Sequence, residues 1–202
     1  MFDAALRPWI DRCLDPVGRG LARLGVSANA VTWFGFLLGI GAAVAAAFGA
    51  TLAAALLILG NRLCDGLDGA VARAGGASDL GAYLDITLDF IFYSAVPFGL
   101  ALANPDHALA AAFLMFSFVG TGSSFLGFAI IAQKRGISTE ARGKKGFFYL
   151  GGLTEGGETI IFLLVVVLFP QFFIPLAWIF GSLCWVTTGT RIWSAIVQFD
   201  DR

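Results

Sequence analysis

Long apolar runs separated by short polar segments dominate the chain. A helix that crosses the bilayer core needs roughly 20 mostly apolar residues. Six runs approach or exceed this length, at 31–50, 51–74, 80–103, 108–132, 147–169 and 172–197. The second is apolar in its first half only, and the fifth contains the glycine-rich acidic stretch LGGLTEGGETI. The pattern predicts an all-α integral membrane protein, a six-helix bundle over residues 29–198 within a single domain, 1–202.

The first 28 residues have a different pattern, in which basic and bulky apolar positions alternate. The basic residues are Arg7, Arg12, Arg19 and Arg23. Basic amphipathic helices of this kind typically lie in the membrane interface. We therefore expect 1–28 to be a juxtamembrane amphipathic surface helix. A short helix that packs on the core is the alternative.

Charge is scarce and unevenly distributed. Charged residues make up 13% of the 202 residues, whereas soluble domains carry about 25%. The predicted outer loops near Gly49, Asn104 and Pro170 contain no Lys or Arg, and the basic loops fall on the opposite side. By the positive-inside rule both termini are cytoplasmic, in an inner or cytoplasmic membrane. The net charge of −1 gives no sign of nucleic-acid binding, and we expect membrane lipids as partners.

Four aspartates interrupt this apolar sequence at the junction of the second and third runs. Asp65 and Asp68 are three residues apart, and Asp85 and Asp89 are four apart, so each pair shares one helical face. The sequence AGGAS (74–78) between the pairs favours a turn. Two antiparallel helices would then bring four carboxylates together at the cytoplasmic end of the bundle.

Such a cluster requires positive charge, because acidic groups inside membrane proteins are costly. All-oxygen sites suit hard divalent cations, and two cations about 3.5–4 Å apart suit displacement at phosphorus. The alternative is an intramembrane ion-pair network with Arg62 and Arg73. Two arginines cannot neutralise four carboxylates, so the sequence favours a metal site.

These residues also resemble the signature of the CDP-alcohol phosphotransferase (phosphatidyltransferase) family, D-x2-D-G-x2-A-R-x7-8-G-x3-D-x3-D. All its specified positions match here, at Asp65, Asp68, Gly69, Ala72, Arg73, Gly81, Asp85 and Asp89. The upstream SANAVTWFGFLLG is similar to the family's P-N-x-x-T segment. Asn29 and Thr32 match this segment, and Ala28 replaces the usual proline.

The resemblance implies a membrane enzyme, often a homodimer, that transfers a phosphatidyl group from a CDP-linked lipid donor to the hydroxyl of a small alcohol and releases CMP. Asp65, Asp68, Asp85 and Asp89 would bind two divalent cations, Mg²⁺ or Mn²⁺, with Ca²⁺ as another occupant. Asp89 would also be the catalytic general base. The implied nucleotide-binding residues are Asn29, Thr32, Asp65, Gly69, Ala72, Arg73 and Gly81.

Two further segments are candidates for binding the acceptor or a lipid headgroup. The basic residues Arg142, Lys144 and Lys145 would attract anionic groups, although they also follow from membrane topology alone. Glu155 and Glu158, three apart, could attract a cationic acceptor. Alternatively, they could stabilise a helix N-terminus through its dipole. His107, in a predicted outer loop, is expected to be solvated.

Other functions remain open at this point. The donor is CDP-diacylglycerol in the favoured interpretation, because the chain is short, and CDP-choline or CDP-ethanolamine with a lipid acceptor in the alternative. A cation transporter would spread its acidic residues across the membrane, whereas here they cluster at one end. A catalytically dead family member would be expected to lack the complete aspartate set.

Overall fold

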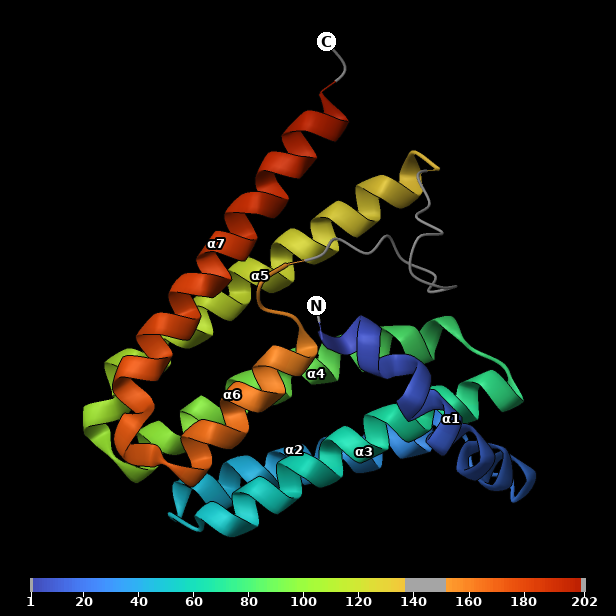
Figure 1. The fold of residues 1–202 in the computed structure, drawn as a ribbon, viewed down its shortest axis with the longest axis horizontal. Helices are drawn as coiled ribbons and strands as arrows, with labels where there is room; N and C mark the ends of the chain where they lie inside the picture. Colours follow the sequence, from blue (N-terminus) through green and yellow to red (C-terminus); the bar gives the residue numbers. More distant parts are fainter. Residues whose placement is uncertain (1, 137–151, 201–202) are drawn as a thin grey trace.

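The computed structural model describes residues 2–136 and 152–200, with side chains from Ile10 onward. These residues form α-helices joined by short connections, with two 3₁₀ turns and no β-strand (Figure 1). The helices are α1 (Phe2–Arg23), α2 (Ala28–Ala47), α3 (Thr51–Gly75), α4 (Asp79–Ala103), α5 (Ala108–Lys134), α6 (Gly156–Leu168) and α7 (Phe173–Phe199), and the 3₁₀ turns are η1 (Pro105–His107) and η3 (Pro170–Phe172). The predicted all-α class is confirmed.

Four of the helical segments in the described ranges are long and apolar enough to cross a membrane. They are α2, α4, η1 with α5, and η3 with α7. Helix α3 is not among them, because its second half is polar. Helix α6 has only 13 residues, fewer than the roughly 20 that a full span requires. The predicted count of six spans is therefore not confirmed.

The connections between helices lie at two ends of the bundle. Residues of the α2–α3 connection, of η1 and of η3 line one common cavity, with Gly49, Asn104 and Pro170 among them. The aspartate-bearing ends of α3 and α4 lie away from these connections (Figure 1). The three connections predicted to share the outer side are thus close together.

Close packing of α2, α3 and α4 depends on glycine. A Cβ at Gly35 would lie 2.7 Å from the Cβ of Cys64, and one at Gly39 would lie 2.7 Å from the ring of Phe92. A Cβ at Gly99 would clash with the backbone oxygen of Ala43. Small residues let membrane helices approach closely, so these glycines bring the aspartate-bearing helices against α2.

Helix α1 packs on the second half of α3. A Cβ at Gly18 would lie 2.5 Å from that of Ala70, and Leu14 lies against Gly66. Arg73 forms ion pairs with Asp11 and Asp15 at 2.9 and 2.6 Å. These contacts agree with the alternative of a helix packed on the core. The predicted position of α1 at the membrane surface is not confirmed.

The fifth predicted run does not form a helix over its whole length. Residues 152–155 are not helical, and α6 begins at Gly156. Thr187 Oγ1 accepts hydrogen bonds from the backbone N–H groups of Leu153 and Thr154 at 3.1 and 3.3 Å. The backward extension of this helix is therefore wrong for 152–155, because these amides bond to α7. Residues 137–151 lie outside the described ranges.

His107 is buried, which corrects the expectation of a solvated side chain. It is 8% exposed, its Nδ1 lies 3.3 Å from Leu100 O, and its ring centroid is 4.9 Å from that of Phe173. The η1 turn folds the imidazole back between α4 and α7, which the short polar sequence NPDH does not reveal.

Replacing Gly99 with alanine should destabilise the bundle by about 1–3 kcal/mol, the usual cost of overpacking a tight core. The new Cβ would meet the backbone of α2, which cannot rotate away. Gly127→Ala is the control, because nothing lies within 4 Å of a Cβ there. Equilibrium unfolding in mixed micelles measures both variants. Equal stability of the two would contradict the packing argument.

Candidate metal and phosphate site

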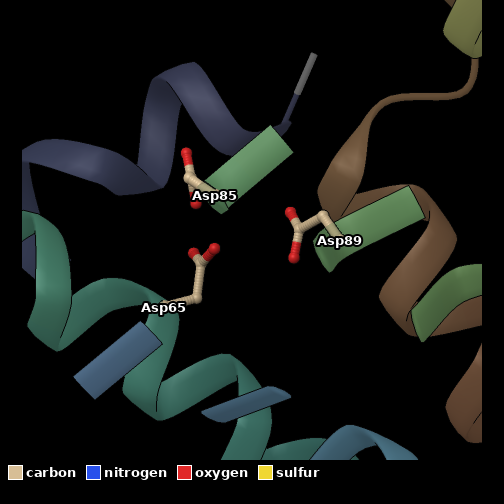
Figure 2. Close-up of side chains that lie close together, drawn as sticks. All are labelled: Asp65, Asp85 and Asp89. Atoms are coloured by element: carbon tan, nitrogen blue, oxygen red, sulfur yellow. The ribbon is translucent and has the colours of Figure 1, made fainter. Parts of the chain in front are cut away.

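The last half of α3 and the first half of α4 place three carboxylates side by side. One oxygen from each of Asp65, Asp85 and Asp89 lies within 4.8 Å of the others. Figure 2 shows these side chains pointing toward one another, Asp65 from α3 and the other two from α4. The structure therefore brings together three of the four predicted metal ligands in one cluster.

Local sequence explains how the two helices turn back on each other. Gly76, with φ +104, follows the end of α3 in a conformation that residues with a Cβ rarely adopt. Ser78 then caps α4, and its Oγ accepts a hydrogen bond from Gly81 N at 3.0 Å. Serine at an N-cap satisfies a backbone donor that would otherwise lack a partner. This tight turn fixes the register of the two aspartate pairs.

Asp68, the fourth predicted ligand, is the least solvent-exposed carboxylate of the set. It is 8% exposed, and its Oδ2 accepts a hydrogen bond of 2.7 Å from Thr32 Oγ1 on α2. Asp68 does not belong to the three-oxygen cluster, but it lines the same small cavity as Asp65, Asp85 and Asp89. Four carboxylates thus surround one space.

The oxygen atoms around this cavity suit a hard divalent cation. The cavity measures about 20 Å³ and is completed by Thr32, Gly35, Phe36, Asn61 and Leu88. A space of roughly 10–15 Å³ is enough for one water molecule, so one ion fits. Carboxylate and amide oxygens are the ligands that Mg²⁺, Mn²⁺ and Ca²⁺ prefer. The residues present therefore fit a divalent cation, whereas the predicted number of two cations is not confirmed.

One arginine and one tyrosine contact the cluster directly. Arg62 Nη2 lies 2.8 Å from Asp65 Oδ2, and its Nη1 lies 4.0 Å from Asp89 Oδ2. Tyr93 donates a hydrogen bond of 3.0 Å to the same Asp89 oxygen. Arg73 forms its ion pairs with α1, so it is not the second counter-charge that an ion-pair network would need. Arg62 is thus the counter-charge seen beside Asp65 and Asp89 among the described residues.

The predicted nucleotide-binding residues lie along the same helix junction. Asn29 Oδ1 would be 3.0 Å from a Cβ at Gly81, so α2 and α4 are in close contact there. Thr32 is held by Asp68, and Gly69 and Ala72 follow on α3. Arg73 contacts the aspartates of α1, which motif spacing alone does not indicate.

The tentative acceptor residues have separate outcomes. Arg142, Lys144 and Lys145 lie outside the described residues. Glu155 and Glu158 form a capping box at the start of α6, in which each side chain accepts a hydrogen bond from the other residue's backbone N–H. The hydrogen bond from Glu155 N to Glu158 Oε2 is 3.3 Å long. Their position favours the helix-terminus role that the sequence left open.

Three polar residues of the helices were missed by the motif. Tyr93 follows Asp89 by four residues and Asn61 precedes Asp65 by four, so helical spacing could have found both. Arg191 on α7 is 8% exposed, donates to Thr121 O at 2.9 Å and lies 5.6 Å from the Phe125 ring centroid. An arginine within an apolar run is itself a signal of a structural or functional site.

A helical bundle of membrane type, with four carboxylates around one cavity at one end, is an arrangement suited to enzymes that act on phosphate groups. The family model of the CDP-alcohol phosphatidyltransferases matches residues 25–193. The chain belongs to this family. It is accordingly a transferase of phosphate-containing groups in phospholipid synthesis, and the family excludes the cation transporter that was considered from the sequence.

Relatives and solved structures agree with this assignment. The inner membrane protein YnjF of Escherichia coli is 50% identical over 195 residues, 96% of this chain and 95% of the relative, which supports a multi-pass membrane protein. The archaetidylinositol phosphate synthase of Pyrococcus horikoshii is 28% identical and covers 94% of each chain.

Solved structures of the phosphatidylinositol phosphate synthase of Mycobacterium tuberculosis are among those with a similar fold. The structure with CDP-DAG bound superposes with a TM-score of 0.76 at 24% identity, over 95% of this chain and 98% of that one. The complex with manganese and citrate superposes with a TM-score of 0.75 at 26% identity, over 94% of this chain and 92% of that one. The fold is therefore shared over nearly the whole chain.

Removing the positive charge of Arg62 should tighten metal binding. Arg62 competes with a cation for Asp65 and Asp89, and a unit charge at about 4 Å contributes roughly 1–4 kcal/mol. We expect Arg62→Gln to lower the Mn²⁺ dissociation constant by about tenfold, which is roughly 1.4 kcal/mol. This dissociation constant is measured by titrating EDTA-stripped protein with Mn²⁺ and detecting the free ion by electron paramagnetic resonance (EPR).

Arg73→Gln is the matched control for Arg62→Gln. It removes one arginine from the same helix, but that arginine pairs with Asp11 and Asp15 instead of the cluster. Its Mn²⁺ affinity should remain within about twofold of the unmodified protein, since an exposed ion pair contributes little. If both variants behave alike, Arg62 does not compete with the metal.

Proposed function

We propose that the chain transfers a phosphatidyl group from CDP-diacylglycerol to the hydroxyl of a small alcohol and releases CMP, with divalent metal. The observation that carries this proposal is the meeting of Asp65, Asp85 and Asp89 within 4.8 Å. The CDP-DAG bound to the M. tuberculosis enzyme of the same fold supports the choice of donor. The CDP-choline-type reaction is the alternative.

The four aspartates would hold the divalent cations. Asp65 and Asp68 come from α3, and Asp85 and Asp89 from α4, so the helix turn at Gly76 determines their relative positions. Divalent cations bound there supply positive charge that offsets the charge on the diphosphate and on the leaving CMP. Manganese in the M. tuberculosis structure supports such a site.

Asp89 is the candidate general base. It is half-buried, and its Oδ2 accepts the hydrogen bond from Tyr93, 3.0 Å away. This bond orients the carboxylate and leaves its other oxygen available to take the proton of an acceptor hydroxyl. A base within about 2.6–3.2 Å of the proton it removes contributes roughly 10²–10⁴-fold to the rate. The alkoxide then attacks phosphorus, and the bond to CMP breaks.

Lipid substrates impose a position on this site. The diacylglycerol tails of the donor must remain in the bilayer while its diphosphate reaches the aspartates, so the cluster should lie at headgroup depth. We propose one domain over 1–202, with α1 at the cytoplasmic surface, six helices embedded over 29–198, and the aspartates and both termini on the cytoplasmic side. The alternation of loops that contain Lys or Arg with loops that contain neither supports this orientation. A homodimer is part of the same proposal.

The acceptor is the least defined reactant. Glu155 and Glu158 bond within the α6 cap, which leaves little support for binding of a cationic alcohol. The names of several relatives, phosphatidylinositol phosphate synthase and archaetidylinositol phosphate synthase, support a phosphorylated polyol. Arg142, Lys144 and Lys145 are candidate phosphate-binding residues for such an acceptor.

CMP release from CDP-diacylglycerol tests the reaction. Purified protein with Mg²⁺ or Mn²⁺ is offered inositol phosphate, glycerol phosphate and their unphosphorylated alcohols, and CDP-choline with diacylglycerol in a parallel assay. We expect acceptor-dependent CMP release that EDTA abolishes, and a loss of at least about a hundredfold in Asp89→Asn, because the amide cannot take the proton.

Asp106→Asn is the control for Asp89→Asn. Asp106 lies in η1, a turn whose neighbouring residues line the cavity away from the aspartates. Its substitution should leave turnover within about twofold, the range expected of a surface change. Near-normal turnover of Asp89→Asn would refute the base assignment, and persistence of CMP release in EDTA would refute the metal-dependent reaction.

A further inference from the structure

The cavity between the aspartates contains one oxygen that no protein group satisfies. Asn61 Oδ1 is buried and has no hydrogen-bond partner among the residues that the structure describes. The residue is 5% exposed and lines the same cavity as the four carboxylates. It precedes Asp65 by four residues and Asp68 by seven, so it shares their face of α3. Buried polar atoms without partners are rare and require an explanation.

The orientation of the Asn61 amide is determined by its other end. Nδ2 donates a hydrogen bond of 2.9 Å to the backbone oxygen of Gly35 on α2. Flipping the amide would place two acceptor oxygens against each other, so the network assigns nitrogen to this position. Oδ1 is therefore the atom left for the cavity.

The walls of the cavity offer Oδ1 no donor. Ionised carboxylates only accept hydrogen bonds. The one hydroxyl in the lining belongs to Thr32, and its single proton is directed to Asp68 Oδ2 at 2.7 Å. Phe36, Leu88 and Gly35 contribute no polar side-chain atom. Within the described residues, this cavity is lined by acceptors, and its natural complement is a cation.

We propose that Asn61 is an additional ligand of the metal site, whose Oδ1 supplies a neutral oxygen to the cation held by Asp65, Asp85 and Asp89. This inference rests on the proposed function, since it concerns the same cation. A neutral oxygen adds coordination without adding to the repulsion among the carboxylates. The bond from Nδ2 to Gly35 fixes the amide in place, so α2 positions a ligand that α3 carries.

The competing explanation is that Asn61 only joins α3 to α2 through Nδ2. The two explanations differ in which atom of the amide matters. Asn61→Ala removes both atoms, whereas Asn61→Asp keeps an oxygen and loses the donor to Gly35. Cys64→Ala is the packing control, because Cys64 is buried on the same helix against the same Gly35 but does not line the cavity.

The experiment measures Mn²⁺ affinity of the full chain in micelles, stripped with EDTA and free of nucleotide, by EPR titration. Loss of a residue that supports metal binding typically costs about 10–100-fold in affinity. We expect Asn61→Ala to raise the Mn²⁺ dissociation constant at least about tenfold on that scale. Asn61→Asp should stay within about threefold of the unmodified protein or bind more tightly, since it keeps an oxygen ligand, and Cys64→Ala should be unchanged.

Each other outcome has a defined meaning. Equal weakening in Asn61→Ala and Asn61→Asp, or no change in either, overturns the ligand role. If Asn61→Ala does not fold, Asn61→Leu takes its place in the comparison, because leucine has the same number and branching of side-chain heavy atoms as asparagine but no oxygen. Failure of the unmodified protein to bind Mn²⁺ would instead refute the metal-dependent function, so the two failures are distinguishable.

Discussion

The mutual repulsion of four carboxylates at a helix junction is the constraint on which the rest of the structure depends. Asp65, Asp68, Asp85 and Asp89 line one cavity, and Arg62 pairs with Asp65 and approaches Asp89. The surrounding elements all bring these groups closer. Glycines allow the helices to approach closely, Gly76 lies in the turn that reverses the chain, and Thr32 donates a hydrogen bond to Asp68. Positive charge beside these carboxylates reduces their repulsion, and this is the physical basis of the proposed cation site.

Helical periodicity explains why much of the site could be predicted from sequence. Spacings of three and four residues determine which side chains share a face, and the AGGAS segment indicates the turn, so Asp65, Asp85 and Asp89 could be expected to converge. Asp68 was expected with them, yet it is drawn toward α2 by Thr32, which lies 36 residues away. The partner of a side chain across helices depends on packing that local spacing does not contain.

The remaining differences have the same origin. Arg73 matches the family signature, but its contacts are with Asp11 and Asp15, 62 and 58 residues earlier. Hydropathy could not count the spans because the groups that make the site also lower the apolar character of α3. At α6, the hydroxyl of Thr187 provides a partner for backbone groups of 152–155, so the helix starts later than apolarity predicts. Function and tertiary hydrogen bonds override the local pattern here.

The protein groups around the cavity differ in how they would affect a bound cation. Arg62 reduces the repulsion among carboxylates, but it occupies oxygens that a metal would use. Asn61 carries no charge, and its oxygen is available because its nitrogen is bonded to Gly35. A fifth carboxylate at that position would increase the repulsion, and an apolar residue would leave the cation one oxygen short. An amide supplies an oxygen ligand without adding negative charge, and its hydrogen bond to Gly35 on α2 fixes its orientation. The close packing of α2 and α3 is thereby connected to the chemistry at the end of the bundle.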